Sequence, residues 1–75
     1  MKLESGKRYL LLVGGQDVSR IYVKYLYFDF EHNKHVFQDD IDEILVKESE
    51  MLEGREEDKN IYGCKYPIIW IHPGR

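Results

Sequence analysis

The sequence has one cysteine, two prolines and no long apolar run. Because Cys64 is alone, an intramolecular disulfide, the usual staple of small secreted domains, is excluded. No stretch approaches the roughly 18 apolar residues of a membrane span. The apolar run Tyr9–Val13 is too short for the core of a signal peptide. These features predict a cytoplasmic protein that does not bind a membrane.

The length and composition predict one folded domain, residues 1–75. Burying enough apolar surface to offset chain entropy takes most of a chain of 75 residues. Hydrophobic residues make up 43% and charged residues 33%, which is a globular balance. Aromatic residues reach 13%, and six of them are tyrosines, which suit half-exposed binding surfaces.

The net charge of −3 is unevenly distributed along the chain. Residues 1–37 carry six Lys/Arg and four Asp/Glu, whereas residues 38–75 carry five and ten. Ten acids fall between Asp39 and Asp58, with only Lys47 and Arg55 among them. A surface of that sign repels phosphate and attracts basic partners.

The front half has the pattern of an antiparallel β-meander. An apolar strand over Tyr9–Val13 is followed by a turn at Gly14-Gly15-Gln16-Asp17 and by a β-branched and aromatic strand over Ser19–Phe30. Asn33 can take the left-handed conformation in the next turn, before a third strand over His35–Gln38.

The two-residue period of a strand divides Ser19–Phe30 into two faces. The predicted core face consists of Ile21, Val23, Tyr25 and Tyr27. The opposite face consists of Arg20, Tyr22, Lys24, Leu26 and Phe28.

Beyond Asp39 and Asp40, the spacing predicts an amphipathic helix that ends near Gly54. The apolar stripe of this helix consists of Ile41, Ile44, Leu45, Met51 and Leu52. The opposite, acidic face consists of Asp42, Glu43, Val46, Glu50 and Glu53. Glu48 falls within the apolar stripe, where burial without a partner would cost several kcal/mol. It therefore either meets a polar partner or shows that the register is wrong.

Tyr66–Ile71 is the most apolar stretch and predicts a buried strand beside the first one. The predicted fold class is therefore α+β: a meander of about three strands, one amphipathic helix and a C-terminal strand completing the sheet. The alternative is a small five-strand SH3-like β-barrel in which Ile41–Lys47 is a strand.

Catalytic and metal-binding patterns are weak. His32, His35, Cys64 and His72 lie at distant places without the close pairs of zinc sites. No histidine has a neighbouring motif that would activate Cys64 or Ser49 as a nucleophile, and Gly14-Gly15 lacks the spacing of a phosphate loop. We therefore predict a non-catalytic protein without a cofactor or a metal.

The first functional hypothesis is a protein-binding module, an inhibitor or regulator of the phage or mobile-element type. Its acidic helix face would imitate nucleic-acid phosphates and occupy a basic surface of a partner protein. The predicted contact residues are Asp42, Glu43, Val46, Glu50, Glu53 and Glu57. The alternative is that these acids form only a solvated helix face, which keeps the protein soluble without binding a partner.

The second hypothesis is a domain that binds single-stranded nucleic acid through alternating aromatic and basic residues of one strand. The predicted contact residues are Arg20, Tyr22, Lys24 and Phe28. The acidic net charge disfavours this hypothesis, and aromatic strand faces are more often structural. Self-association as a homodimer, through the last strand or the Tyr/Phe faces, is a third alternative.

Overall fold

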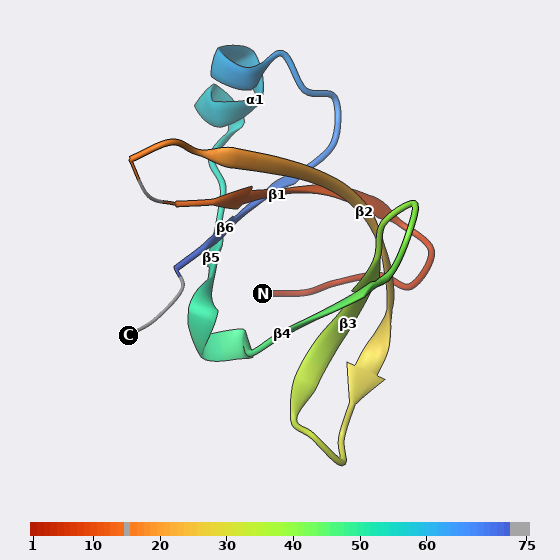
Figure 1. The fold of residues 1–75 in the computed structure, drawn as a ribbon. Coiled ribbons are helices and arrows are strands. Elements are labelled where there is room, and N and C mark those ends of the chain that lie inside the picture. The colour runs from red at the N-terminus through yellow and green to blue at the C-terminus, as the bar shows by residue number, and fades with distance from the viewer. Residues whose placement is uncertain (15, 73–75) are drawn as a thin grey trace.

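The computed structural model describes residues 1–14 and 16–72, so the predicted turn conformation of Gly15 and residues 73–75 lie outside the described residues (Figure 1). The elements in chain order are β1 (Arg8–Val13), β2 (Ser19–Asp29), β3 (Lys34–Gln38), β4 (Glu43–Val46), the 3-10 turn η1 (Glu48–Glu50), β5 (Met51–Glu53), α1 (Glu56–Tyr62) and β6 (Ile68–Ile71). No helix within the described residues is long and apolar enough to cross a bilayer.

The strands form one mixed sheet in the order β4-β3-β2-β1-β6-β5. The antiparallel meander β1-β2-β3 is confirmed, including the positive φ of 57° at Asn33 in the β2–β3 turn. The count of three meander strands was too low, because β4 continues the meander beside β3. Over the described residues the sheet is curved but not closed, and β4 and β5 form its edges (Figure 1).

The C-terminal strand returns beside the first strand, as the sequence predicts. β6 pairs in parallel with β1, with Leu10 opposite Ile68 and Leu12 opposite Trp70, and pairs with β5 on its other side. It is therefore not an edge strand, so its apolar run has no free edge through which two copies could pair.

The predicted helix over Ile41–Leu52 is wrong, because this segment forms β4, η1 and β5. The alternative fold was correct that a strand lies within Ile41–Lys47, although the sheet is not a closed barrel. Asp39, which resembled a helix N-cap, instead accepts hydrogen bonds from the amides of Ile41 and Asp42 at 2.8 and 2.7 Å in the turn before β4. Four register pairs with β3 outweigh the local helical spacing.

The helix α1 lies between β5 and β6, beyond Gly54, where the predicted helix was expected to end. In α1, the carboxylate of Asp58 accepts a hydrogen bond from the Arg55 amide at 2.8 Å, and Gly63 ends the helix in the left-handed conformation with φ of 59°. Gly54 ends β5 rather than the predicted helix. A Cβ at Gly54 would lie 2.7 Å from the carbonyl oxygen of Ile68, so glycine permits close contact between β5 and β6.

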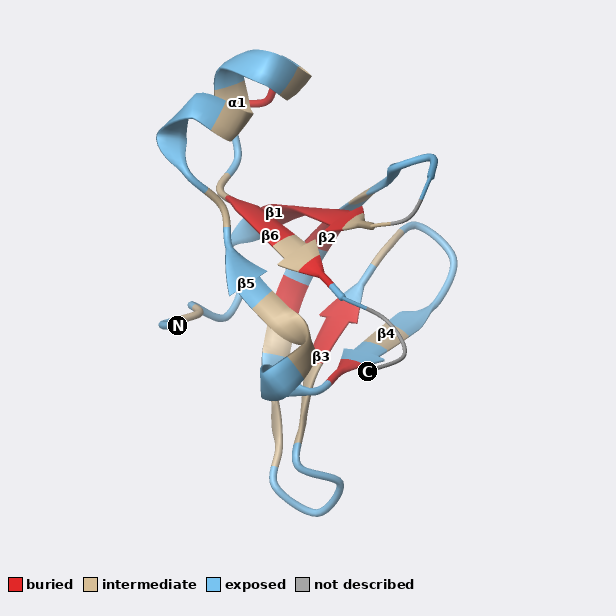
Figure 2. Cartoon of the chain, turned by 90° about the vertical axis from the view of Figure 1, so that its left-hand side faces the viewer, coloured by how far each residue is buried: buried red, intermediate tan, exposed pale blue. Residues whose placement is uncertain are grey.

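Buried residues gather on β1, β2, β3 and β6 (Figure 2). They form two apolar clusters, one on each side of the curved sheet. The inner cluster, which the segment around Leu3 also contacts, consists of Tyr9, Leu11, Val23, Tyr25, Phe37, Val46, Ile69 and Ile71. The smaller outer cluster, which the end of α1 and the loop after it contact through Tyr62 and Cys64, consists of Leu10, Leu12, Cys64 and Ile68. A helix of seven residues covers only part of the outer side.

A β-bulge divides β2 into two halves with opposite side-chain parity. The register with β3 shifts between Tyr25 and Tyr27, so Tyr27 pairs with Val36 and Phe28 pairs with His35. The prediction that Tyr27 belongs to the core is therefore wrong, whereas Val23 and Tyr25 are buried as predicted. Because the bulge adds one residue to β2, Tyr27 faces the side predicted for Phe28, and Phe28 faces the side predicted for Tyr27.

Candidate functional site

Three of the four residues predicted to form an aromatic and basic strand face lie together on the outer side of the sheet. Arg20 and Tyr22 are the cross-strand partners of Leu12 and Leu10, whose side chains form the outer cluster, and Lys24 follows on the same face. Arg8, the partner of Lys24, adds a base that the sequence hypothesis did not include.

Phe28 does not join this group. Its ring lies 4.8 Å from the His35 ring, centroid to centroid, and His35 in turn contacts the buried Tyr25. Because Tyr25 belongs to the inner cluster, the bulge has directed Phe28 to the inner side. The inclusion of Phe28 in the predicted face is thus corrected.

Two tyrosines from the C-terminal part of the chain extend the outer surface. Tyr66 lies edge-to-face with Tyr22 at a centroid distance of 6.4 Å, and the Arg20 guanidinium lies 5.1 Å from the centroid of the Tyr62 ring. Tyr22 and Tyr66 are 52% and 38% exposed. The aromatic-basic surface is hereafter defined as Arg8, Arg20, Tyr22, Lys24, Tyr62 and Tyr66.

The outer cluster holds these tyrosines in place. Cys64, in the loop after α1, is buried, and its sulfur accepts a hydrogen bond from the Tyr66 amide at 3.3 Å. The Trp70 indole donates a hydrogen bond to Asp58 at 3.1 Å, which ties α1 to β6. Sequence reasoning missed Tyr62 and Tyr66, since only the fold brings them beside β2.

The six residues predicted to form an acidic helix face do not share one face, because no helix joins them. Val46, their predicted centre, is 5% exposed and belongs to the inner cluster. Glu50 accepts a hydrogen bond from the Lys47 amide in η1. The remaining four are exposed on three different elements and a turn: Asp42 before β4, Glu43 in β4, Glu53 in β5 and Glu57 in α1.

An acidic group does persist in the β3–β4 turn. Ile41 at this turn is 92% exposed, and the acids Asp39, Asp40 and Asp42 flank it in sequence. Hydrogen bonds from the Asp42 and Ile41 amides hold the pKa of the Asp39 carboxyl below its usual range. An exposed apolar side chain among carboxylates is therefore presented by a structured turn.

Glu48 is exposed and has a polar partner, so its predicted place in a helical apolar stripe is wrong. The His35 ring joins the Glu48 carboxylate at 2.5 Å through Nε2 and the Tyr25 hydroxyl at 2.9 Å through Nδ1. Both contacts are satisfied when Nε2–H donates to Glu48 and Nδ1 accepts from Tyr25. Burial, with a smaller effect of the Glu48 charge, raises the pKa of Tyr25. The hydrogen bonds that link Tyr25, His35 and Glu48 attach η1 to the sheet.

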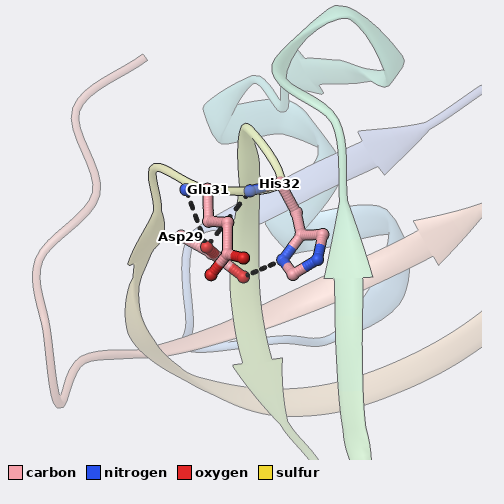
Figure 3. A group of neighbouring side chains, drawn as sticks. All are labelled: Asp29, Glu31 and His32. Carbon is pink, nitrogen blue, oxygen red and sulfur yellow. Dashed lines mark hydrogen bonds and ion pairs between the residues drawn. The ribbon is translucent and has the colours of Figure 1, made fainter.

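His32 belongs to a second polar group, in the β2–β3 turn (Figure 3). Ligand atoms of Asp29, Glu31 and His32 lie within 4.8 Å of one another. The Asp29 carboxylate already contacts His32 Nδ1 at 2.7 Å and accepts hydrogen bonds from the Glu31 and His32 amides. These bonds, that from the His32 side chain first, lower the pKa of Asp29. A cation would compete with them, and the absence of a metal site stays a prediction.

Comparison of the chain with protein-family models, with curated proteins and with solved structures found no match.

Proposed function

We propose that the protein is a non-catalytic binding module that holds single-stranded nucleic acid on its aromatic-basic surface. The observation that carries this proposal is the adjacency of Tyr22 and Tyr66, two exposed rings from distant parts of the chain. Aromatic rings of this kind stack on bases of any sequence, because every base has a π-face. The expected ligand is thus an unpaired strand bound without strong sequence preference.

The charges around these rings support the same ligand. Arg8 and Lys24 are paired across β1 and β2, and Arg20 lies one step further along the outer face of β2 than Tyr22. Three bases along two strands can neutralise successive phosphates, while the bases of the strand stack on the tyrosines. Among the acids, Glu48 and Glu50 lie in η1, where Glu48 contacts His35, whereas the acidic β3–β4 turn begins directly after Gln38, the partner of Lys24.

Two features limit the extent of the aromatic-basic surface. Glu43 lies in the same cross-strand row as Lys24, two strands away, and its charge opposes phosphate at that end. At the other end, the Arg20 guanidinium already makes a cation–π contact with the Tyr62 ring. The site therefore has room for a few nucleotides, and we expect affinity in the micromolar range at low salt.

Fluorescence anisotropy with a labelled pyrimidine oligonucleotide tests the proposal. Tyr22→Ala should weaken binding by about tenfold or more, since loss of one stacked base costs about 1–3 kcal/mol. Neutralisation of about three phosphates predicts that log K falls with log salt at a slope of about −2.

Tyr27→Ala is the matched control. Tyr22 and Tyr27 are on the same strand and are both 52% exposed. The bulge turns Tyr27 to the outer side as well, but it lies opposite Val36, beyond the row of Lys24 and outside the aromatic-basic surface. It should leave the affinity unchanged. The proposal fails if the oligonucleotide does not bind at low salt, or if the two substitutions weaken binding equally.

A second candidate function is protein binding through the acidic β3–β4 turn instead of the predicted acidic helix face. Ile41, almost fully exposed within the acidic turn, is suited to an apolar pocket with a basic rim on a partner protein. Ile41→Ala combined with Asp42→Lys would then abolish capture of the partner, whereas the same changes would leave oligonucleotide binding intact. Retained capture would exclude this candidate.

A further inference from the structure

A cavity of about 260 Å³ lies where β1 and β6 begin and β5 ends. Part of its wall is apolar and comes from the sheet and from the N-terminal segment, through Leu3, Tyr9, Pro67 and Ile69. This volume is that of roughly nine water molecules in the liquid. It is therefore large enough for a small organic molecule but too small for a nucleotide strand.

The charges that line the cavity are mainly positive, in a protein whose net charge is −3. The four lining bases are Lys2, Lys7, Arg55 and Lys59, and the two lining acids are Glu53 and Glu56. Lys59 pairs with Glu56 at 3.3 Å, which removes one charge of each sign. Among the described residues, the other three bases form no ion pair. An excess of cations around an apolar wall favours an anion with an apolar body.

The wall formed by the β5–α1 connection is held firmly. The Gly54 amide donates a hydrogen bond to the carbonyl of Ile68 at 2.7 Å, and there is no room for a side chain at this glycine. Asp58 fixes the backbone of Arg55 through its amide. The Lys7 ammonium lies 5.9 Å from the centroid of the Tyr9 ring. The Lys7 ammonium and the backbone of Arg55 are thus positioned before any ligand arrives.

We propose that this cavity binds a small organic anion, a carboxylate joined to a short aromatic or aliphatic body. The body would lie against the half-buried Leu3 and Pro67, and the carboxylate would contact Lys7, Arg55 and Lys2 at the rim. An anion with about eleven non-hydrogen atoms, such as hydrocinnamate, matches the cavity and binds with a dissociation constant on the order of 1 mM. This site is independent of the aromatic-basic surface.

Titration of the full chain with hydrocinnamate, followed through backbone amide chemical shifts by NMR, tests the proposal. The expected result is a saturable shift of the amides of Lys7, Gly54 and Arg55. Hydrocinnamyl alcohol has the same body without the charge and should bind at least roughly fivefold more weakly, since it makes no charge-assisted contact.

Substitutions separate this cavity from general attraction of anions. Lys7→Ala and Arg55→Ala should each weaken hydrocinnamate binding by roughly threefold to tenfold. Lys24→Ala removes a base from the outer surface and should leave that affinity unchanged. Each of four results would overturn the proposal. These are no saturable shift up to about 10 mM, equal binding of the alcohol, shifts centred on Tyr22, and an equal loss of hydrocinnamate affinity in all three variants.

Discussion

The two sides of β2 differ in what covers them, although the same strand supplies both. Val23 and Tyr25 face the concave side, where the curved sheet and the N-terminal segment bury them. Tyr22 faces the convex side, where a helix of seven residues leaves it half exposed. The inner side therefore stabilises the domain, whereas the outer side is available for a ligand.

This difference implies that substitutions on the two sides should separate stability from binding. Aromatic residues occur on both sides, so composition alone does not distinguish them. A core aromatic residue contributes through its buried area and close packing. An exposed aromatic residue contributes little to folding, and its ring remains free to stack.

The largest expected effect is on the inner side. Phe37 is 0% exposed, and its ring lies edge-to-face with Tyr25 and Tyr9. Phe37→Ala should lower the free energy of unfolding by about 3–5 kcal/mol, measured by urea denaturation. Tyr22→Ala on the outer side should lower it by about 1 kcal/mol or less. Similar losses in the two variants would contradict the division into a structural side and a binding side.

A smaller effect tests the bulge that separates the two halves of β2. Phe28 is half-buried between His35 and Phe30, whereas Tyr27 is exposed. Phe28→Ala should therefore cost about 1–2 kcal/mol of unfolding free energy, and Tyr27→Ala about 0.5 kcal/mol or less. The unbroken alternation of the sequence predicts the opposite order, so the same denaturation experiment decides between the two registers.

The strands of the meander could be predicted from the sequence because each is an apolar or β-branched run between turn residues. The position of β6 beside β1 also followed from its apolar character. The helix could not be placed in this way. The spacing of Ile41, Ile44 and Leu45 fits both a helix and a strand with a turn, and pairing with β3 selects the strand. The true helix has local signals, an acidic first turn and Gly63, but little apolar periodicity.

The candidate site was predicted only within one strand. Arg20, Tyr22 and Lys24 share a face because of the two-residue period, which is a local property. A bulge obeys no such local rule, and it removed Phe28 from the face. Tyr66 joins Tyr22 through the return of the chain after α1, a contact that depends on the whole topology.

The smallest expected effect concerns the attachment of α1 to the outer side, through Asp58. Hydrogen bonds from the Arg55 amide and the Trp70 indole lower the pKa of the Asp58 carboxyl. Because the folded pKa lies below the unfolded value of about 4, the carboxylate stabilises the fold above that pH. Its contribution disappears as the pH falls through the folded pKa.

Asp58→Asn should therefore lower the melting temperature at neutral pH, and the difference from the unsubstituted protein should narrow below about pH 4. Trp70 fluorescence reports the same contact, since its indole loses a charged acceptor. Glu57→Gln is the control, because among the described residues the Glu57 side chain makes no hydrogen bond or ion pair. The difference in melting temperature between Glu57→Gln and the unsubstituted protein should not narrow below about pH 4. A gap for Asp58→Asn that persists unchanged at low pH would show that the negative charge of Asp58 does not contribute to stability through these two hydrogen bonds.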